Sequence, residues 1–297
     1  MHLRGTYIPI PFLGLFLSVV GLLVGSFVNV LIARLPANES IVSPGSRCPN
    51  CGEAIRYYDN IPIFSWLLLR GRCRRCDWEI PIRYPVIEAM CALAFLLVFF
   101  RVRHLSASPE LLAWSLLHGL SFMALLLAIS VIDLDHMIIP DGLSLTGTLF
   151  ALAISFGAAE ATGVNWQHAS VGALVGGGTI LFVAITYRII RGRDGMGMGD
   201  VKLMALLGAY LGFSAVPFIL FAASIQGTLF AAIWWMTSRS KRDDRVGPEV
   251  NDGGGPDDDQ ESMGSLALPF GPFLALSGMQ WYLLHDVLPR NPLIMNI

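Results

Sequence analysis

The chain alternates between long apolar runs and shorter polar segments. A helix that crosses the hydrocarbon core of a bilayer needs about 20 largely apolar residues, and runs near this length recur along the whole chain. They predict transmembrane helices at 10–33, 85–100, 111–132, 143–156, 171–190, 201–213, 215–236 and 266–284. The fourth and sixth runs are the shortest. The expected fold class is therefore an all-α polytopic membrane protein with about eight transmembrane helices.

Composition supports this class. Of 297 residues, 54% are hydrophobic and only 14% are charged, which is too apolar for soluble domains whose surfaces must be covered with polar groups. The net charge of −2 gives no sign of a nucleic-acid partner, and the lipid bilayer is the expected surrounding.

Positive charge is concentrated on one side of the predicted topology. All lysines and arginines fall in or beside the loops after the first, fifth and seventh helices, except for Arg4, Arg101, Arg103 and Arg290. Loops rich in these residues stay in the cytoplasm, so this side should be cytoplasmic and both ends of the chain should lie outside. The first run lacks a small-residue cleavage site, and we expect it to be a retained helix.

The chain then divides into three parts. Residues 1–33 form the first transmembrane helix, 34–84 a cytoplasmic loop with four cysteines, and 85–297 the membrane core. Within the core, segment 238–265 is basic and then rich in Gly and Asp, so it is predicted to be a disordered cytoplasmic loop.

Two CxxC pairs lie in the first cytoplasmic loop, formed by Cys48, Cys51, Cys73 and Cys76. Two such turns can complete a tetrahedral site of four thiolates, the pattern of a zinc-ribbon-like insertion. Such a site has no open position and is therefore structural. Disulfides are the alternative, but they are rare in the reducing cytosol. Zinc would fold a loop that is too small and polar to form its own core.

Two aspartates stand at helix ends on the same predicted side. Asp133 ends the third helix and Asp200 begins the sixth, so the two side chains could meet although they are distant in the sequence. Two carboxylates a few Å apart cannot both ionise easily and would share one proton. One could then act as base on a water while the other donates to a scissile carbonyl. The alternative is that Asp200 is only a helix N-cap.

Glycines 195, 197 and 199 precede Asp200. They would let an extended substrate backbone approach the two aspartates, or let the loop adopt positive φ; the alternative is an ordinary loop. Asp141, directly before the fourth helix, is expected to cap it.

Several motifs in a fixed order resemble those of the type IV prepilin peptidases, which are GxGD aspartyl proteases. The motifs are GSFVNV from residue 25, the two CxxC pairs, RYP at 83–85 with Glu88, IDLD at 132–135, PD at 140–141, GMGDVK at 197–202 and PFGPF at 269–273. The resemblance implies that Asp133 and Asp200 are catalytic and that Gly197, Gly199 and Lys202 belong to the active-site loop. It also implies a multi-pass protein of the bacterial inner membrane that cleaves prepilins or pseudopilins of type IV pili and type II secretion at the cytoplasmic face.

The resemblance further implies N-methylation of the new N-terminus with S-adenosylmethionine, an activity associated with the cysteine-bearing loop. Glu88 and Asn29 could serve it or the substrate, or could be hydrogen-bonding residues between helices.

Two other functions would also use these residues. A transporter could carry protons or cations on membrane carboxylates, although its site is expected near the midplane. A scaffold could recruit cytoplasmic partners through the zinc module. The sequence leaves the oligomeric state open.

Overall fold

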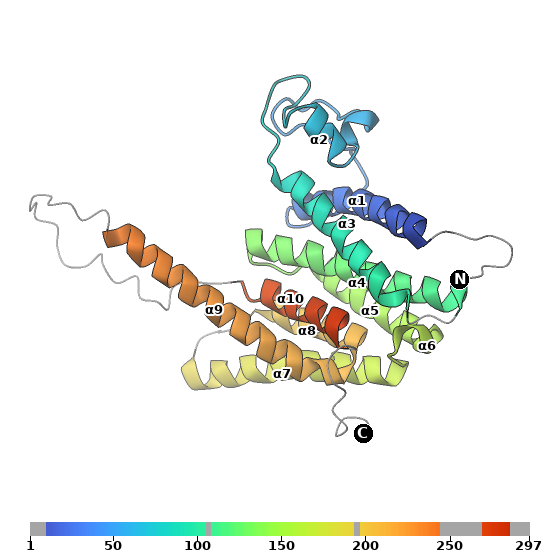
Figure 1. Ribbon diagram of the computed structural model, residues 1–297. Helices are drawn as coiled ribbons and strands as arrows, with labels where there is room; N and C mark the ends of the chain where they lie inside the picture. Colours follow the sequence, from blue (N-terminus) through green and yellow to red (C-terminus); the bar gives the residue numbers. More distant parts are fainter. Residues whose placement is uncertain (1–9, 105–107, 193–196, 244–268, 286–297) are drawn as a thin grey trace, which may run out of the picture.

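The computed structural model describes residues 10–104, 108–192, 197–243 and 269–285 of the chain. The regular secondary structure of these residues is helical, and they contain no strand. The eight main helices, drawn in Figure 1, are α1 (Ile10–Arg34), α3 (Arg83–Val102), α4 (Pro109–His136), α5 (Asp141–Gly157), α7 (Trp166–Arg191), α8 (Met198–Leu211), α9 (Val216–Asp243) and α10 (Gly271–Leu284). A helix is thus present at each of the eight predicted places.

Five of these helices are long and apolar enough to cross a membrane: α1, α3, α4, α7 and α9. The other three are shorter, with 17 residues in α5 and 14 each in α8 and α10. At 1.5 Å per residue, a 14-residue helix is only about 21 Å long, against a hydrocarbon core of about 30 Å. Residues 266–268 of the last predicted span lie outside the described residues.

Helix α9 continues to Asp243, so the first six residues of the segment 238–265, which was predicted to be a disordered loop, are helical. The segment lacks apolar residues, but extending an existing helix by one turn requires no new nucleation. Residues 244–265 lie outside the described part of the chain.

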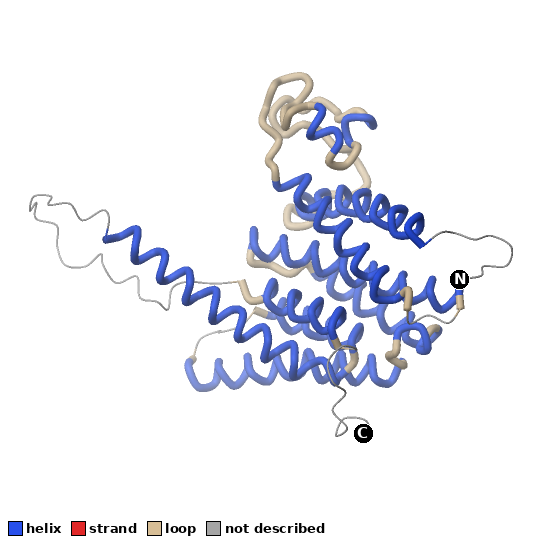
Figure 2. The backbone as a smooth tube through the Cα atoms, in the orientation of Figure 1, coloured by secondary structure: helices blue, strands red, loops and turns tan. Residues whose placement is uncertain are grey.

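The cysteine-bearing segment between α1 and α3 forms a lobe of its own. Figure 2 shows it as mostly loop, placed beyond the ends of α1 and α3 and away from the other helices. It contains one short α-helix, α2 (Phe64–Leu68), and a 3-10 turn at Tyr57–Asn60. A second short helix, α6 (Ala159–Thr162), lies between α5 and α7.

Helices α7 and α8 approach each other closely through glycines. A Cβ atom on Gly172 would lie 2.2 Å from the carbonyl oxygen of Gly208, and one on Gly208 would lie 2.0 Å from the carbonyl oxygen of Gly172. Small residues at such crossings let helix backbones pack in direct contact, as is common in membranes.

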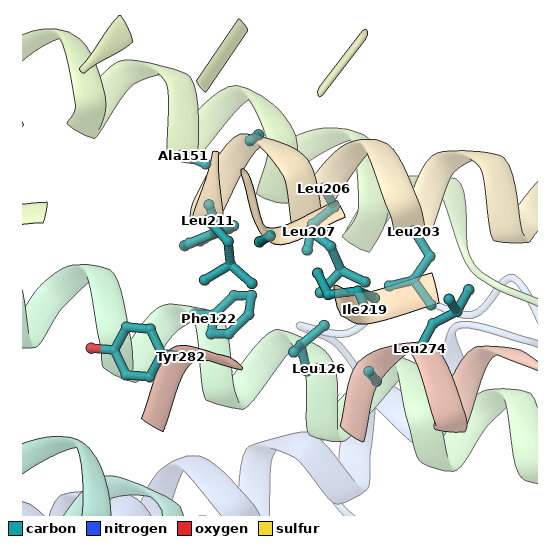
Figure 3. Packing of buried hydrophobic residues seen from close by; sticks show 14 of the residues in the cluster. Phe122, Leu126, Ala151, Leu203, Leu206, Leu207, Leu211, Ile219, Leu274 and Tyr282 are labelled. Atoms are coloured by element: carbon teal, nitrogen blue, oxygen red, sulfur yellow. The ribbon is translucent and has the colours of Figure 1, made fainter. Parts of the chain in front are cut away.

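Helix α8 lies inside the bundle. Leu203, Leu206 and Leu207 are fully buried, and Figure 3 shows them packed with Ile219 of α9 and Leu274 of α10. An apolar helix surrounded by other helices on all sides needs no polar face. The core therefore fixes the position of the helix that carries Asp200.

Outer surfaces of the bundle are apolar as well. Large hydrophobic side chains of α7 and α9 are exposed, including Leu174, Phe182 and Phe221. Continuous exposed apolar surface of this kind is unusual for a soluble protein and is what a lipid-facing surface requires.

Candidate functional site

Helix ends from distant parts of the sequence meet at one end of the bundle. Asp133 lies in the last turn of α4, which ends when Met137 adopts a left-handed conformation with φ of 54°. Asp200 lies in the first turn of α8, and α10 begins at Gly271. Ile139 packs against the start of α10, which binds Asp133, and against the residue before Asp200, so the two aspartates lie at the same end of the bundle. The expectation that both aspartates lie at the same end of the bundle is confirmed.

Asp133 is held by the beginning of α10. The backbone N–H of Gly271 donates a hydrogen bond of 3.1 Å to Oδ2 of Asp133, and this bond is buried. Asp133 itself is only 5% exposed. A Cβ on residue 271 would lie 2.5 Å from Oδ2, so only glycine permits this approach.

Ile139 lies between the two elements that carry the site. A Cβ on Gly199 would lie 3.0 Å from Cβ of Ile139, and a Cβ on Gly271 would lie 3.3 Å from its Cδ1. The Ile139 side chain therefore packs against the residue before Asp200 and against the residue that binds Asp133. It fixes the spacing between α8 and α10.

The predicted glycine roles are partly corrected. Gly197 is the N-cap of α8 with φ of −73°, and Gly199 is helical, so neither has positive φ. Gly195 lies outside the described residues. Close packing against Ile139, and not an unusual backbone conformation, explains why residue 199 is a glycine. Asp200 is not an N-cap, because the cap position is Gly197 and Asp200 is three residues further along.

Asp141 does not cap α5 as predicted. The N-cap is Pro140, and no side chain caps this helix. The Asp141 carboxylate instead forms an ion pair with Lys202, one turn into α8. A neighbouring ion pair joins Arg83, the first residue of α3, to Asp135 near the end of α4. The two pairs tie α5 to α8 and α3 to α4 around the aspartates.

Sequence reasoning did not find these ion pairs or the Gly271 contact. Each residue lies within a motif used for the resemblance, but no local pattern indicates which partner it meets. The partners are 52, 61 and 138 residues apart.

The four cysteines of the first loop form one cluster. Their sulfur atoms all lie within 4.8 Å of one another, and Sγ of Cys48 is 3.7 Å from Sγ of Cys76. All four thiols are free. A group of four sulfurs this compact could hold a metal ion such as zinc.

The two halves of the cluster have the same backbone fold. The N–H of Cys48 bonds to the carbonyl of Glu53 at 2.9 Å, and that of Cys73 bonds to the carbonyl of Trp78 at 2.9 Å. Four residues after each first cysteine the backbone has positive φ, 70° at Gly52 and 52° at Asp77. This repeated turn directs both cysteines of each pair to a common point.

Asn50, between the first two cysteines, forms a hydrogen bond with a cysteine of the second pair. Its amide donates to Sγ of Cys76 at 3.5 Å. This hydrogen bond is the main reason why the pKa of Cys76 is lowered to about 6. The thiolate required for metal binding is therefore favoured at neutral pH.

A cavity of about 540 Å³ separates the cysteine lobe from the ends of α1 and α3. Buried Glu88 lies on its α3 wall and accepts a hydrogen bond of 2.7 Å from the backbone N–H of Ile63. Ile63 has φ of 59° and ψ of −50°, a strained conformation for a β-branched residue. Glu88 therefore stabilises an unusual turn at the cavity wall.

Other polar groups of this cavity are also held in place. Nδ2 of Asn29 donates to the carbonyl of Tyr84 at 3.2 Å, which joins α1 to the start of α3. Arg74 donates to both oxygens of Asp59 at 2.6 and 2.9 Å, and this pairing lowers the pKa of the Asp59 carboxyl. The cavity wall is thus preformed and contains both acidic and aromatic side chains.

Comparison with known proteins also separates the part of the chain that carries the cysteines from the part that carries the aspartates. Residues 19–102 match the bacterial peptidase A24 N-terminal domain, and residues 120–232 match the type IV leader peptidase family. A prepilin leader peptidase/N-methyltransferase of Pseudomonas putida is 34% identical over 88% of this chain and 87% of its own length. This chain belongs to the type IV prepilin leader peptidase family. The suspected family resemblance is confirmed.

Further members of the family are similarly close. A prepilin leader peptidase/N-methyltransferase of Myxococcus xanthus is 37% identical over 81% of this chain and 67% of its own length. The type 4 prepilin-like proteins leader peptide-processing enzyme of Escherichia coli is 35% identical over 88% of this chain and 90% of its own length. No solved structure matches the chain. Asp133 and Asp200 both lie in the segment that matches the leader peptidase family, and the cysteines lie in the other matched segment.

Proposed function

We propose that this leader peptidase family member is a membrane aspartyl endopeptidase that removes leader peptides from type IV prepilins and pseudopilins and then N-methylates the new N-terminus. Asp133 and Asp200 are the catalytic pair. The observation that carries the proposal is their position at one end of the bundle, where Gly271 binds Asp133 and Ile139 packs against both Gly271 and Gly199, the residue before Asp200.

The two aspartates supply general acid–base catalysis. The ionised carboxylate takes a proton from a water, which attacks the scissile carbonyl carbon, while the protonated partner donates to the carbonyl oxygen. When the tetrahedral species collapses, the C–N bond breaks and a proton passes to the leaving amine. The Gly271 hydrogen bond orients one oxygen of Asp133 during this exchange. Gly197, the N-cap of α8, and Gly199 and Lys202 in its first turns adjoin the aspartates and receive the substrate backbone.

The membrane arrangement follows from the helices and charges. We place all eight main helices in the bacterial inner membrane as a multi-pass bundle, with the short helices α5, α8 and α10 shielded by the longer ones. The end with Asp133 and Asp200 also carries Arg34, Arg83 and Lys202, so it faces the cytoplasm by the positive-inside rule. The chain divides into 1–33, the loop 34–84 and the peptidase core 85–297.

Zn²⁺ is the metal that we assign to Cys48, Cys51, Cys73 and Cys76. Four compact sulfur ligands are typical of structural zinc, and the repeated turns bring the four sulfurs within 4.8 Å of one another. Because all four positions would be filled by protein, the ion would fold the lobe without entering the reaction.

The cavity between the cysteine lobe and α1/α3 is the proposed place of S-adenosylmethionine, which would supply an electrophilic methyl group on a positively charged sulfur. Acidic Glu88 suits that charge, and Trp66, Trp78 and Tyr84 offer surfaces for a planar base. Arg83, which directly precedes the cavity residues Tyr84 and Pro85, forms an ion pair with Asp135 at the end of α4 that bears Asp133, so the cavity and the aspartates lie on the same side of the bundle.

The principal alternative is a proton- or cation-coupled transporter. It would also use membrane carboxylates, but such sites lie near the midplane on broken helices. Here both aspartates lie at helix ends on one side of the bundle.

One experiment tests the proposal against this alternative. The purified chain is mixed with a pilin-like precursor with and without S-adenosylmethionine, and the product is identified by mass spectrometry. We expect leader removal in both samples and N-methylation only with the cofactor. An intact precursor, combined with proton flux in proteoliposomes, would support the transporter instead.

A further inference from the structure

One side of the short helix α2 in the cysteine lobe is apolar and exposed. Phe64, Leu67 and Leu68 are 64%, 59% and 81% exposed, and their spacing puts them on one face of the helix. Trp66 and Leu69 lie on the other side and line the cavity next to α1 and α3. The apolar face therefore points away from the proposed cofactor cavity, and no described part of the chain covers it.

Helix α2 is attached beside the first turns of a membrane-spanning helix. α3 has 20 residues and is about 30 Å long, which equals the hydrocarbon thickness, so Arg83 lies near the membrane boundary. Glu88, about 7.5 Å further along α3, accepts the hydrogen bond of 2.7 Å from the N–H of Ile63, the N-cap of α2. This bond holds the start of α2 near the level at which α3 enters the bilayer.

Apolar side chains that would face lipid form one stripe along α3. They recur every three or four residues, and all are exposed: Ile82, Val86, Met90, Leu93 and Leu97. The stripe begins two residues after Ile80, whose carbonyl accepts a hydrogen bond of 3.0 Å from Nε1 of Trp66 in α2. Figure 1 shows α2 near the start of α3. The lipid-facing surface of the bundle therefore begins close to α2.

An unpaired cation follows the apolar face. Arg70, two residues after Leu68, is exposed and forms no ion pair with the described residues. The neighbouring arginines 72, 74 and 75 are each paired with a carboxylate of the lobe. An apolar face next to a free arginine is the combination that binds a bilayer surface with anionic phosphates.

We propose that the face formed by Phe64, Leu67 and Leu68 inserts into the cytoplasmic leaflet, where headgroups meet acyl chains, and that Arg70 binds the phosphate of an anionic phospholipid. The contact anchors the cysteine lobe to the bilayer beside α3. It rests on the proposed membrane arrangement and is independent of the catalytic roles of the aspartates.

Photochemical labelling in a bilayer tests the contact. A photoreactive benzophenone amino acid replaces Leu68 in the full chain, which is reconstituted into vesicles of equal phosphatidylglycerol and phosphatidylcholine. After illumination, mass spectrometry should find lipid adducts at position 68. Leu69, the same residue type on the cavity side, is the matched control and should give few such adducts. Position 93, in the stripe on α3, should be labelled by lipid whether or not α2 contacts the membrane.

The charge of the lipid tests Arg70. Adducts at position 68 should contain phosphatidylglycerol about fivefold more often than phosphatidylcholine, which corresponds to about 1 kcal/mol for one basic residue at an anionic surface. Arg70→Gln should lose this preference. Arg75→Gln removes an equal charge from the same lobe, but from an arginine paired with Glu53, and should keep it.

Several results would overturn the proposal. Lipid adducts at position 93 without any at 68 would place α2 in water while the membrane arrangement stands, and no adducts at either position would contradict that arrangement itself. A crosslink from position 68 to a second copy of the chain would assign the face to a dimer. Equal lipid labelling at 68 and 69 would contradict insertion of one face. A preference for phosphatidylglycerol that survives Arg70→Gln would exclude Arg70 from the contact.

Discussion

Gly271 binds Asp133 across 138 residues of sequence, through a buried hydrogen bond of 3.1 Å from its backbone N–H to Oδ2 of the carboxylate. The first residue of the last helix thereby orients one of the two proposed catalytic side chains. Because Ile139 packs against both Gly271 and Gly199, the same contact region also positions the start of α8 and Asp200.

Gly271→Ala tests this contact. The added methyl group would lie 2.5 Å from Oδ2 of Asp133, so either the carboxylate or α10 must move. A displacement of this size at a catalytic group should lower the rate of leader cleavage about 100-fold. Gly178→Ala is the matched control, because a Cβ there meets nothing within 4 Å. Wild-type cleavage rates in Gly271→Ala would show that the contact has no catalytic role.

The ion pair of Lys202 with Asp141 should act by positioning α8. We expect Lys202→Met and Asp141→Asn each to lower kcat, and the double variant to be no slower than either single one, because all three lose the same contact. Thermal unfolding should change little, since an exposed pair contributes about 1 kcal/mol or less. Strictly additive losses of kcat would mean that the two residues act separately.

Cys76 should be the most reactive thiol of the zinc-free lobe. Its pKa of about 6, set mainly by Asn50, lies below neutral pH, so the reactive thiolate predominates at pH 7 and is lost as the pH falls through 6. After zinc removal, alkylation followed by peptide mapping should find Cys76 modified first. Asn50→Ala should slow this modification, and added zinc should protect all four cysteines. Alkylation of the four thiols at the same rate with and without added zinc would argue against the metal site.

Glu88→Gln should separate the two proposed activities. The variant loses the charge of the acceptor that holds the strained turn at Ile63, and a hydrogen bond to a charged group contributes about 1.5–3 kcal/mol. Methylation and binding of S-adenosylmethionine should weaken at least tenfold, while leader cleavage should remain. Glu79→Gln, at a carboxylate that is 84% exposed, is the control. Loss of cleavage with intact methylation would contradict the assignment of the cavity.

Much of the fold could be predicted from apolar runs alone. A helix is present at every predicted place, because side chains that face lipid or the bundle interior must be apolar whatever their neighbours are. The sequence could not show whether the run at 201–213 faces lipid or, like α8, is surrounded by other helices, because both environments select the same residue types. Only the packing of Leu203, Leu206 and Leu207 distinguishes them.

The site was predictable in outline but not in its contacts. Two aspartates at helix ends on the same side of the membrane are visible in the sequence, as are two CxxC pairs. The partners of Asp133, Asp135 and Asp141 depend on how helices pack in three dimensions, and no local rule gives Gly271, Arg83 or Lys202 as these partners. The cap predicted at Asp141 was wrong because a cation in another helix binds its carboxylate.

The most direct measurement is the rate at which the purified protein cleaves a pilin-like precursor after Asp133→Asn or Asp200→Asn. If the two carboxylates share the acid and base roles, each single variant should lose about 1,000-fold or more, while methylation of a precursor that has already been cleaved stays at the wild-type rate. A cleavage rate near that of the wild type in either variant would contradict the account.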